Sequence, residues 1–200
     1  QGTLGVLPRP ECCHRLDKPT SGLLVVAKTK PAAVHLTRQF EERTIQKTYV
    51  AIVDGIPKES ADTSMSSFEA HAMGLDVDPN ANVAWQMAQT ILEGKEATTA
   101  WRSMGQFPSP SAADQTVTLV ELKPKTGRYH QLRRTMAWMY ECPIIGDTTY
   151  GTIVSNNPKQ KRWRRGLLLC SNRITLQHPY FNTESGREEW SQLEDRTKYQ

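Results

Sequence analysis

The sequence predicts an α+β fold, and three observations lead to this prediction. The chain has 200 residues, which suits a single domain over residues 1–200. Hydrophobic residues make up 38% and charged residues 23% of the chain, a composition typical of globular proteins. Segments with strand and helix patterns alternate irregularly, which favours α+β over a regular parallel α/β sheet.

The first half of the chain contains two clear strand patterns with a helix pattern between them. Residues 22–28 are mostly apolar and β-branched, which predicts a buried strand. Pro31 suits the first turn of a helix, and residues 32–42 are rich in helix-forming residues. A second strand is expected over residues 47–53. The pattern weakens over residues 56–95, where we expect short strands joined by long loops.

The second half of the chain continues the irregular order. Strand patterns return at residues 98–104 and 116–122, and a Pro-Ser-Pro turn separates them. A helix is then expected over residues 129–140, because three apolar residues recur there at helical spacing: Leu132, Met136 and Met139. A polar loop rich in lysine and arginine follows at residues 154–165. The last strands are expected near residues 167–176.

Several protein classes do not fit this sequence. The longest apolar runs are far shorter than the roughly 20 residues that span a bilayer, and the N-terminus has no secretory pattern. The four cysteines form no CxxC pair, which argues against a structural zinc site. We therefore expect reduced thiols, no bound metal and an intracellular location, in the cytoplasm or in an organelle.

Positive charge is concentrated in one part of the chain. The net charge is +4, but residues 123–173 hold 11 basic and only 2 acidic residues. Such a basic block attracts polyanions and points to nucleic acid as a partner. A solvated basic face would have the same composition, so composition alone leaves both interpretations open.

A polar stretch near the N-terminus, His14–Gly22, is the first candidate for chemistry. It reads HRLDKPTSG and leads directly into the apolar run at residues 22–28. If the stretch is extended, Arg15 and Asp17 point to the same side. Asp17 would then lie on a rigid edge beside the core. The alternative is a turn in which the Asp17 carboxylate only accepts hydrogen bonds from backbone amides.

A second candidate stretch, Thr126–Arg134, reads TGRYHQLRR. If residues from about 129 onward are helical, His130 and Arg133 share one face of the helix. An arginine on a rigid helix is a good partner for a carboxylate or a phosphate. The alternative is an arginine that is merely solvated.

These two stretches and four others resemble the RluA-type pseudouridine synthases, enzymes that isomerise uridine in RNA. A single stretch could arise by chance, but six in the family's order over residues 14–180 identify the family. The stretches are HRLDKPTSGLLVVAK (14–28), KTYVA (47–51), GKEATT (94–99), TGRYHQLR (126–133), PIIGD with the following YG (143–151), and RITLQHP (173–179).

The resemblance implies a fold, a reaction and three catalytic residues. The family fold is a mixed, mostly antiparallel sheet with helices around it and an RNA-binding cleft along one face. The family cleaves the N1–C1′ bond of uridine and rejoins the uracil through C5, without metal or organic cofactor. Asp17 matches the essential aspartate and would be the nucleophile. Arg133 matches the arginine that pairs with this aspartate, and Tyr49 matches the tyrosine that stacks on the uracil.

The resemblance also implies residues that bind RNA. Arg15 would occupy the space that the target uridine vacates when it leaves its stack. The fourth stretch contributes three further candidates for substrate binding: Arg128, His130 and Leu132. Four residues of the polar loop are candidate contacts to the RNA backbone, unless that loop is merely solvated: Lys161, Arg162, Arg164 and Arg165. We expect a monomer whose partner is ribosomal or transfer RNA.

The sequence departs from the family pattern in three places. Only 13 residues precede His14, where members carry an additional strand, so the chain is expected to be a fragment or to have lost that strand. The S4 RNA-binding domain of some members is absent, and Thr135 stands where many members have a histidine. A second hypothesis follows, a catalytically inactive RNA-binding or ribosome-assembly factor. A third is a binder of acidic ligands, which leaves the Asp17 stretch unexplained.

Overall fold

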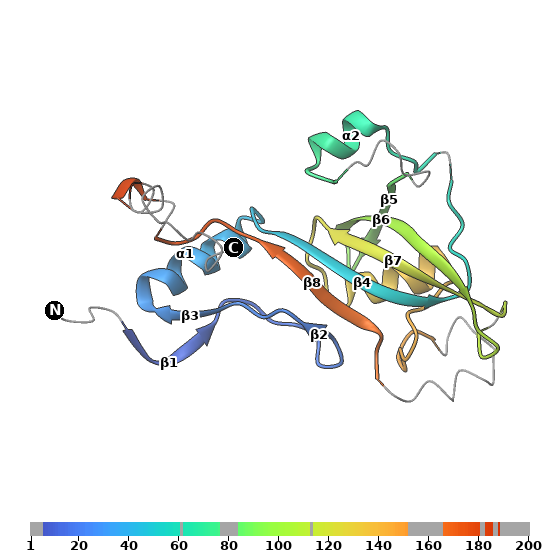
Figure 1. Ribbon diagram of the computed structural model, residues 1–200, viewed down its shortest axis with the longest axis horizontal. Helices are drawn as coiled ribbons and strands as arrows, with labels where there is room; N and C mark the ends of the chain where they lie inside the picture. The colour runs from blue at the N-terminus through green and yellow to red at the C-terminus, as the bar shows by residue number, and fades with distance from the viewer. Residues whose placement is uncertain are drawn as a thin grey trace. The chain divides into compact units, whose positions relative to one another are not determined.

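The computed structural model describes residues 6–60, 62–76, 84–112, 114–151, 166–180, 183–185 and 188. Contacts group the chain into two compact units (Figure 1). The first unit comprises Gln1–Leu16, Leu24–Gln46 and Ile174–Gln200, and the second comprises Asp17–Leu23 and Lys47–Arg173. The single domain expected over residues 1–200 stays a prediction. In the described part of the chain, no helix is long and apolar enough to cross a membrane.

A six-stranded sheet forms the centre of the second unit. In spatial order, its strands are β2 (Ser21–Gly22), β8 (Leu169–Thr175), β4 (Gln46–Asp54), β7 (Thr116–Pro124), β6 (Lys95–Pro108) and β5 (Gln86–Leu92) (Figure 1). β2 runs parallel to β8, whereas the neighbouring pairs β4–β7, β7–β6 and β6–β5 are antiparallel. The prediction of an α+β fold with a mixed, mostly antiparallel sheet is confirmed.

One face of this sheet is covered by the helical segment α3 (Gln131–Arg134) and its continuation η1 (Thr135–Met139). Met136 of η1 is fully buried and belongs to the same core cluster as Val53, Val120 and Leu122 of the sheet. Trp101 joins this cluster, and its ring meets that of Tyr140 edge to face at 4.7 Å. The apolar residues of the strands therefore pack against this helical segment and hold it on the sheet.

The opposite face of the sheet carries α2 (Ser67–Ala72). Ala100 and Trp101 are consecutive in β6, so their side chains point to opposite faces. Ala100 packs in a separate cluster with Ala70, Leu75 and Trp85, which places α2 over the face that η1 does not cover. A helix was not predicted within residues 56–95. Its sequence signal is the capping box of Ser66 and Glu69, which can start even a six-residue helix.

The first unit contains a hairpin-like pair of strands and one helix. Its elements are β1 (Val6–Cys12), β3 (Val26–Thr29) and α1 (Lys30–Glu41), with β1 and β3 antiparallel. Thr29 caps the helix, because its hydroxyl oxygen accepts a hydrogen bond from the Ala32 amide at 3.3 Å. Pro31 lies in the first turn, as predicted. A small core cluster holds the unit together: Cys13, Ala27, Ala33 and Leu36.

The single strand predicted over residues 22–28 is wrong, because residues 23–25 lie between β2 and β3. β2 pairs with β8 in one sheet, and β3 pairs with β1 in another. Gly22, with φ +109°, approaches β8 so closely that a Cβ here would lie 2.3 Å from the Ser171 carbonyl oxygen. One apolar run thus serves two sheets, a division that hydrophobic periodicity does not reveal.

The helix predicted over residues 129–140 is present in part. It begins at Gln131, and after four α-helical residues it continues as a π-helix. The wider π turn changes which side each residue faces. Met136 is therefore buried whereas Met139 is exposed, although regular helical spacing predicts that both lie on one side.

Candidate active site

Asp17 lies in a tight loop that leads into β2. Its backbone carbonyl accepts a hydrogen bond from the Thr20 amide at 2.8 Å, which closes a turn. The Ser21 hydroxyl then donates to the Leu169 carbonyl at 3.1 Å and ties the loop to β8. The Asp17 side chain is 29% exposed. Among the described residues its carboxylate contacts the His130 ring rather than the amides of its own turn, so the alternative of a purely structural turn is not supported.

The loop before α3 is fixed by the side chain of Gln131, which is buried. Its Oε1 accepts hydrogen bonds from the Thr126 hydroxyl at 2.7 Å and from the Arg128 amide at 3.0 Å. Its Nε2 donates to the Thr98 carbonyl of β6 at 3.0 Å. His130, which precedes Gln131, adopts a left-handed backbone conformation with φ 51°. Such backbone angles cost energy outside glycine and persist where the surroundings determine them, as they do here.

Arg133 and Asp147 form a buried ion pair with two hydrogen bonds, from Nε at 2.8 Å and from Nη2 at 2.7 Å. The exposed fractions of the two side chains are 4% and 0%. Asp147 Oδ1 also accepts from the amides of Thr149 at 2.9 Å and Tyr150 at 3.0 Å. Burial alone would raise the pKa of Asp147, but the hydrogen bonds from Arg133 and these amides lower it.

The predicted pairing of Arg133 with Asp17 is wrong. The planar fork of the guanidinium matches a carboxylate that can accept two parallel hydrogen bonds, and Asp147 occupies that position. Within the described residues, Asp17 makes no ion pair with Arg133, and its cationic or imidazole partner is His130. Asp17 nevertheless lies within electrostatic reach, because Asp147 chiefly and Asp17 to a smaller extent raise the pKa of Arg133.

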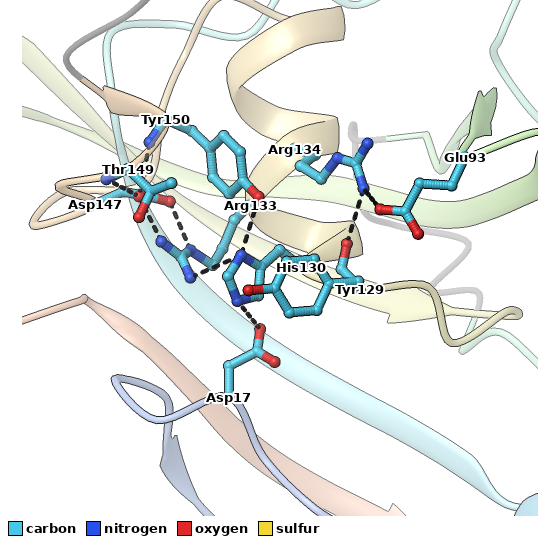
Figure 2. Close-up of polar contacts among 9 residues, drawn as sticks. All are labelled: Asp17, Glu93, Tyr129, His130, Arg133, Arg134, Asp147, Thr149 and Tyr150. Atoms are coloured by element: carbon cyan, nitrogen blue, oxygen red, sulfur yellow. Dashed lines mark hydrogen bonds and ion pairs between the residues drawn. The ribbon is translucent and has the colours of Figure 1, made fainter.

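His130 lies between the ion pair and Asp17 (Figure 2). Its Nε2 is 3.9 Å from Asp17 Oδ2. Its Nδ1 is 3.3 Å from Arg133 Nη1 and 2.9 Å from the Tyr150 hydroxyl. The Tyr129 ring stacks on the imidazole, with centroids 3.7 Å apart and planes inclined by 21°. Hydrogen bonds thus join Asp147, Arg133 and His130, and the Asp17 carboxylate lies 3.9 Å beyond the His130 ring.

The protonation of His130 follows from its neighbours. Burial, followed by the Arg133 charge, lowers the pKa of His130, and the opposing charge of Asp17 does not offset this. The ring is therefore neutral at pH 7 and carries one N–H. Arg133 has only donors, so its hydrogen bond to Nδ1 requires that Nδ1 be the unprotonated nitrogen. The proton then resides on Nε2, which faces the Asp17 carboxylate.

Tyr49 is half-buried in β4 and packs against the main core cluster. Burial raises the pKa of its hydroxyl, the Ser171 side chain acts in the opposite direction, and the Asp17 charge adds to the increase. The phenol is thus close to both β8 and the Asp17 carboxylate. Tyr49 thus packs as a core residue and lies within electrostatic reach of the candidate nucleophile.

The basic block at residues 123–173 is partly neutralised by ion pairs. Among the described residues of the block, four cations are paired, with N–O distances of 3.1, 2.7, 2.8 and 3.7 Å: Lys123–Asp76, Arg133–Asp147, Arg134–Glu93 and Arg173–Asp76. Asp76 and Glu93 precede the block in the sequence, so counting charges within it overstates the positive charge that is available to a ligand. Composition alone could not reveal these distant partners.

The other predicted site residues have different environments. Arg15 is exposed and belongs to the first unit. Arg128 donates from Nε to the Glu96 carbonyl at 2.8 Å. Leu132 is buried in the core cluster, so its side chain supports α3 rather than reaching the surface. The four basic candidates at positions 161, 162, 164 and 165 lie outside the described residues.

The sequence interpretation assigned no role to three residues of the site. Gln131 fixes the loop that carries His130, Asp147 binds Arg133, and Tyr150 contacts His130. All three occur in stretches that resemble the family, TGRYHQLR and PIIGD with YG. The role of Asp147 follows from its buried position beside Arg133, which the structure shows and the sequence alone does not.

The described residues include few groups that could bind a metal ion or react as thiols. In the residues that the structure covers, no group of three or more His, Cys, Asp or Glu side chains could hold a metal ion. The four cysteines are unpaired in the structure, and their reduced state stays a prediction. The site therefore offers carboxylate, imidazole, guanidinium and phenol groups for chemistry.

This fold is that of a pseudouridylate synthase domain. The structure matches human RNA pseudouridylate synthase domain containing 1 with a TM-score of 0.60 and 29% sequence identity, covering 84% of this chain and 64% of that chain. The match and the carboxylate-centred site define the class as an enzyme that isomerises uridine in RNA.

The chain belongs to the RNA pseudouridylate synthase family, whose model matches residues 5–138. It is 34% identical over 196 residues to tRNA pseudouridine synthase C of Vibrio parahaemolyticus, covering 93% of this chain and 76% of that protein. It is 37% identical over 171 residues to tRNA pseudouridine synthase C of Pectobacterium carotovorum, covering 83% of this chain and 43% of that protein. The predicted family is confirmed.

Proposed function

We propose that this chain converts uridine into pseudouridine in transfer RNA, with Asp17 as the nucleophile. The names of the bacterial relatives favour transfer RNA over ribosomal RNA as substrate. The reaction breaks the bond between uracil N1 and ribose C1′, turns the base, and joins C5 to C1′. The proton that C5 loses is balanced by the proton that N1 gains. No atom is gained or lost overall, so the reaction needs no co-substrate.

The observation that supports this proposal most is the position of the Asp17 carboxylate at the exposed end of a buried polar chain. Its neighbour His130 presents a neutral N–H, and the Arg133 charge lies behind that ring. Both groups present positive polarity toward the carboxylate and favour one orientation of it. A nucleophile must be accessible to the substrate and able to leave again, and the partly exposed Asp17 carboxylate suits both conditions.

Tyr49 would stack on the uracil of the flipped nucleotide. Because burial and the Asp17 charge raise the pKa of Tyr49, its hydroxyl keeps its proton at neutral pH. A protonated phenol is a poor base, so we assign Tyr49 to stacking rather than to removal of the C5 proton. Stacking on an aromatic ring contributes about 1–3 kcal/mol per base.

The function is tested with purified protein and unmodified transfer RNA transcripts, followed by chemical mapping of pseudouridine. We expect pseudouridine at one defined uridine. We also expect the activity to persist in EDTA on a short stem-loop that folds without Mg²⁺, since the chemistry needs no Lewis acid. Tight binding without product would favour the inactive RNA-binding factor instead. A strict requirement for added zinc would contradict the proposed chemistry.

His130 is proposed as a positioning residue for Asp17, and two substitutions separate its roles. His130→Ala removes both the acceptor facing Arg133 and the donor facing Asp17, and we expect the single-turnover rate to fall by about 100-fold, the typical cost of a misplaced reacting group. His130→Gln keeps one acceptor and one donor, so most of the rate should remain. An equal loss in both variants would show that hydrogen bonding at His130 is not what matters.

The pH profile distinguishes positioning by His130 from a role in stability. The pKa of His130 is lowered, so the ring is neutral above its ordinary value of 6.5 and gains a proton only below it. Protonation puts a hydrogen on Nδ1, toward the Arg133 guanidinium, and should disturb the contact. We expect the wild-type rate to fall as the pH drops through this range and the His130→Gln rate to fall less. If the wild-type and His130→Gln rates fell equally at acidic pH, His130 would not be the group whose protonation lowers the rate.

A further inference from the structure

Four aromatic rings form a contiguous row beside Asp17. Tyr129 stacks on His130, His130 meets Tyr150 edge to face at 5.7 Å, and Tyr150 meets Trp138 edge to face at 5.4 Å. We call this set the aromatic row. Its middle members are largely covered, with Tyr150 buried, whereas Tyr129 at one end is 61% exposed and Trp138 at the other is 47% exposed.

Specific contacts hold Tyr129 at the exposed end of the aromatic row. Its ring lies at 3.7 Å on the ring of His130, and its backbone carbonyl accepts a hydrogen bond from Arg134 Nη1 at 3.2 Å. Glu93 holds the same guanidinium at 2.8 Å. One face of the Tyr129 ring is therefore covered by His130 and its backbone is held by Arg134, while most of the residue's surface faces solvent. A ring that lies flat on a neighbouring ring, with most of its surface in solvent, can accept a stacked base.

We propose that Tyr129 is a stacking platform for an unpaired base of the RNA, the base of a nucleotide immediately next to the target uridine. This inference rests on the proposed function, which makes RNA the ligand. Every nucleobase has a flat π face that can stack on a tyrosine ring, so the site would be tolerant of base identity.

The geometry identifies which part of the RNA would be bound. The ring beneath Tyr129 is His130, whose Nε2 is 3.9 Å from the Asp17 carboxylate. A base stacked on Tyr129 is therefore separated from the reacting uridine by about one nucleotide rather than by a helical turn. Removing the target uridine from its stack leaves its neighbour without a stacking partner. Tyr129 would replace that partner and extend the stack onto His130.

Three variants test the platform. Tyr129→Ala should weaken binding of a transfer RNA stem-loop by about 5- to 150-fold, the range for loss of one stacked base. Tyr129→Phe keeps the ring and should bind like wild type. Phe68→Ala is the matched control, because Phe68 is an exposed aromatic residue on α2, over the opposite face of the sheet.

Abasic nucleotides in the RNA identify the partner. Removing the base on one side of the target uridine should weaken RNA binding by the wild-type protein as much as Tyr129→Ala does. The same removal should not weaken RNA binding by the Tyr129→Ala variant any further. Removing the base on the other side should weaken both proteins equally. The proposal is overturned if the affinity losses from Tyr129→Ala and from base removal multiply on both sides of the target uridine. It is also overturned if Tyr129→Ala lowers the rate while affinity stays unchanged, since Tyr129 would then only support His130. In either case wild-type pseudouridine formation still reports separately on the proposed function.

Discussion

Replacing Asp17 by asparagine should abolish pseudouridine formation and leave RNA affinity nearly unchanged. Asparagine has the shape of aspartate and still offers an oxygen to the N–H of His130, so the loop should keep its geometry. A neutral amide is a poor nucleophile, however, and cannot form and release a bond to the nucleoside. We expect the single-turnover rate to fall by about a thousandfold or more.

A matched control for this substitution is Asp62→Asn, which changes an exposed aspartate in the loop before α2. The control should keep both wild-type rate and wild-type affinity. Asp17→Asn turnover within tenfold of wild type would show that another group is the nucleophile. A large loss of affinity in Asp17→Asn would instead mean that the carboxylate holds the RNA.

The second large effect is expected at Arg133. Arg133→Ala leaves the fully buried Asp147 carboxylate without its cation, and breaking a buried pair in this way typically costs about 3–5 kcal/mol of stability. His130 also loses the donor that keeps its Nδ1 unprotonated and its proton on Nε2. We expect the order of rates to be wild type, then Arg133→Lys, then Arg133→Ala, because lysine keeps the charge and loses the planar fork. Denaturant unfolding and single-turnover rates are the two measurements.

The contribution of this ion pair to stability has a defined pH dependence. Despite burial, hydrogen bonds lower the pKa of Asp147 in the folded protein below its ordinary 3.8. The stabilisation is therefore complete above that value and is lost as the pH falls through the lowered pKa. Asp147→Asn should reduce the slope of stability against pH in this acidic range. A wild-type slope in that variant, or wild-type unfolding of Arg133→Ala, would contradict the pairing.

Local patterns in the sequence were sufficient for elements whose neighbours are local. α1 was predicted from Pro31 and the helix formers after it, and β4 from its run of apolar and β-branched residues. The division of residues 22–28 between two sheets could not be predicted, because it depends on β1 and β8, which pair with the two halves. The π turn after Arg134 also escaped prediction, since periodicity assumes a constant number of residues per turn.

The candidate site divides in the same way. The family resemblance located Asp17, Tyr49, His130 and Arg133, and the structure brings these four residues into one neighbourhood. It did not reveal that Arg133 binds Asp147 and reaches Asp17 only through His130. Two carboxylates compete for one guanidinium here, and the choice depends on burial and on the amides of Thr149 and Tyr150, which no sequence pattern specifies.

The close approach of Gly22 to β8 has a consequence for how this enzyme can evolve. Only four residues lie between Asp17 and Gly22. The two residues of β2 join the nucleophile's loop to the sheet. Any side chain at position 22 would meet the Ser171 backbone and push the loop outward. The range of substitutions open to this enzyme is thus restricted at a residue with no functional group. Divergence in RNA preference can proceed through exposed side chains such as Tyr129, while the backbone spacing beneath the nucleophile must stay constant.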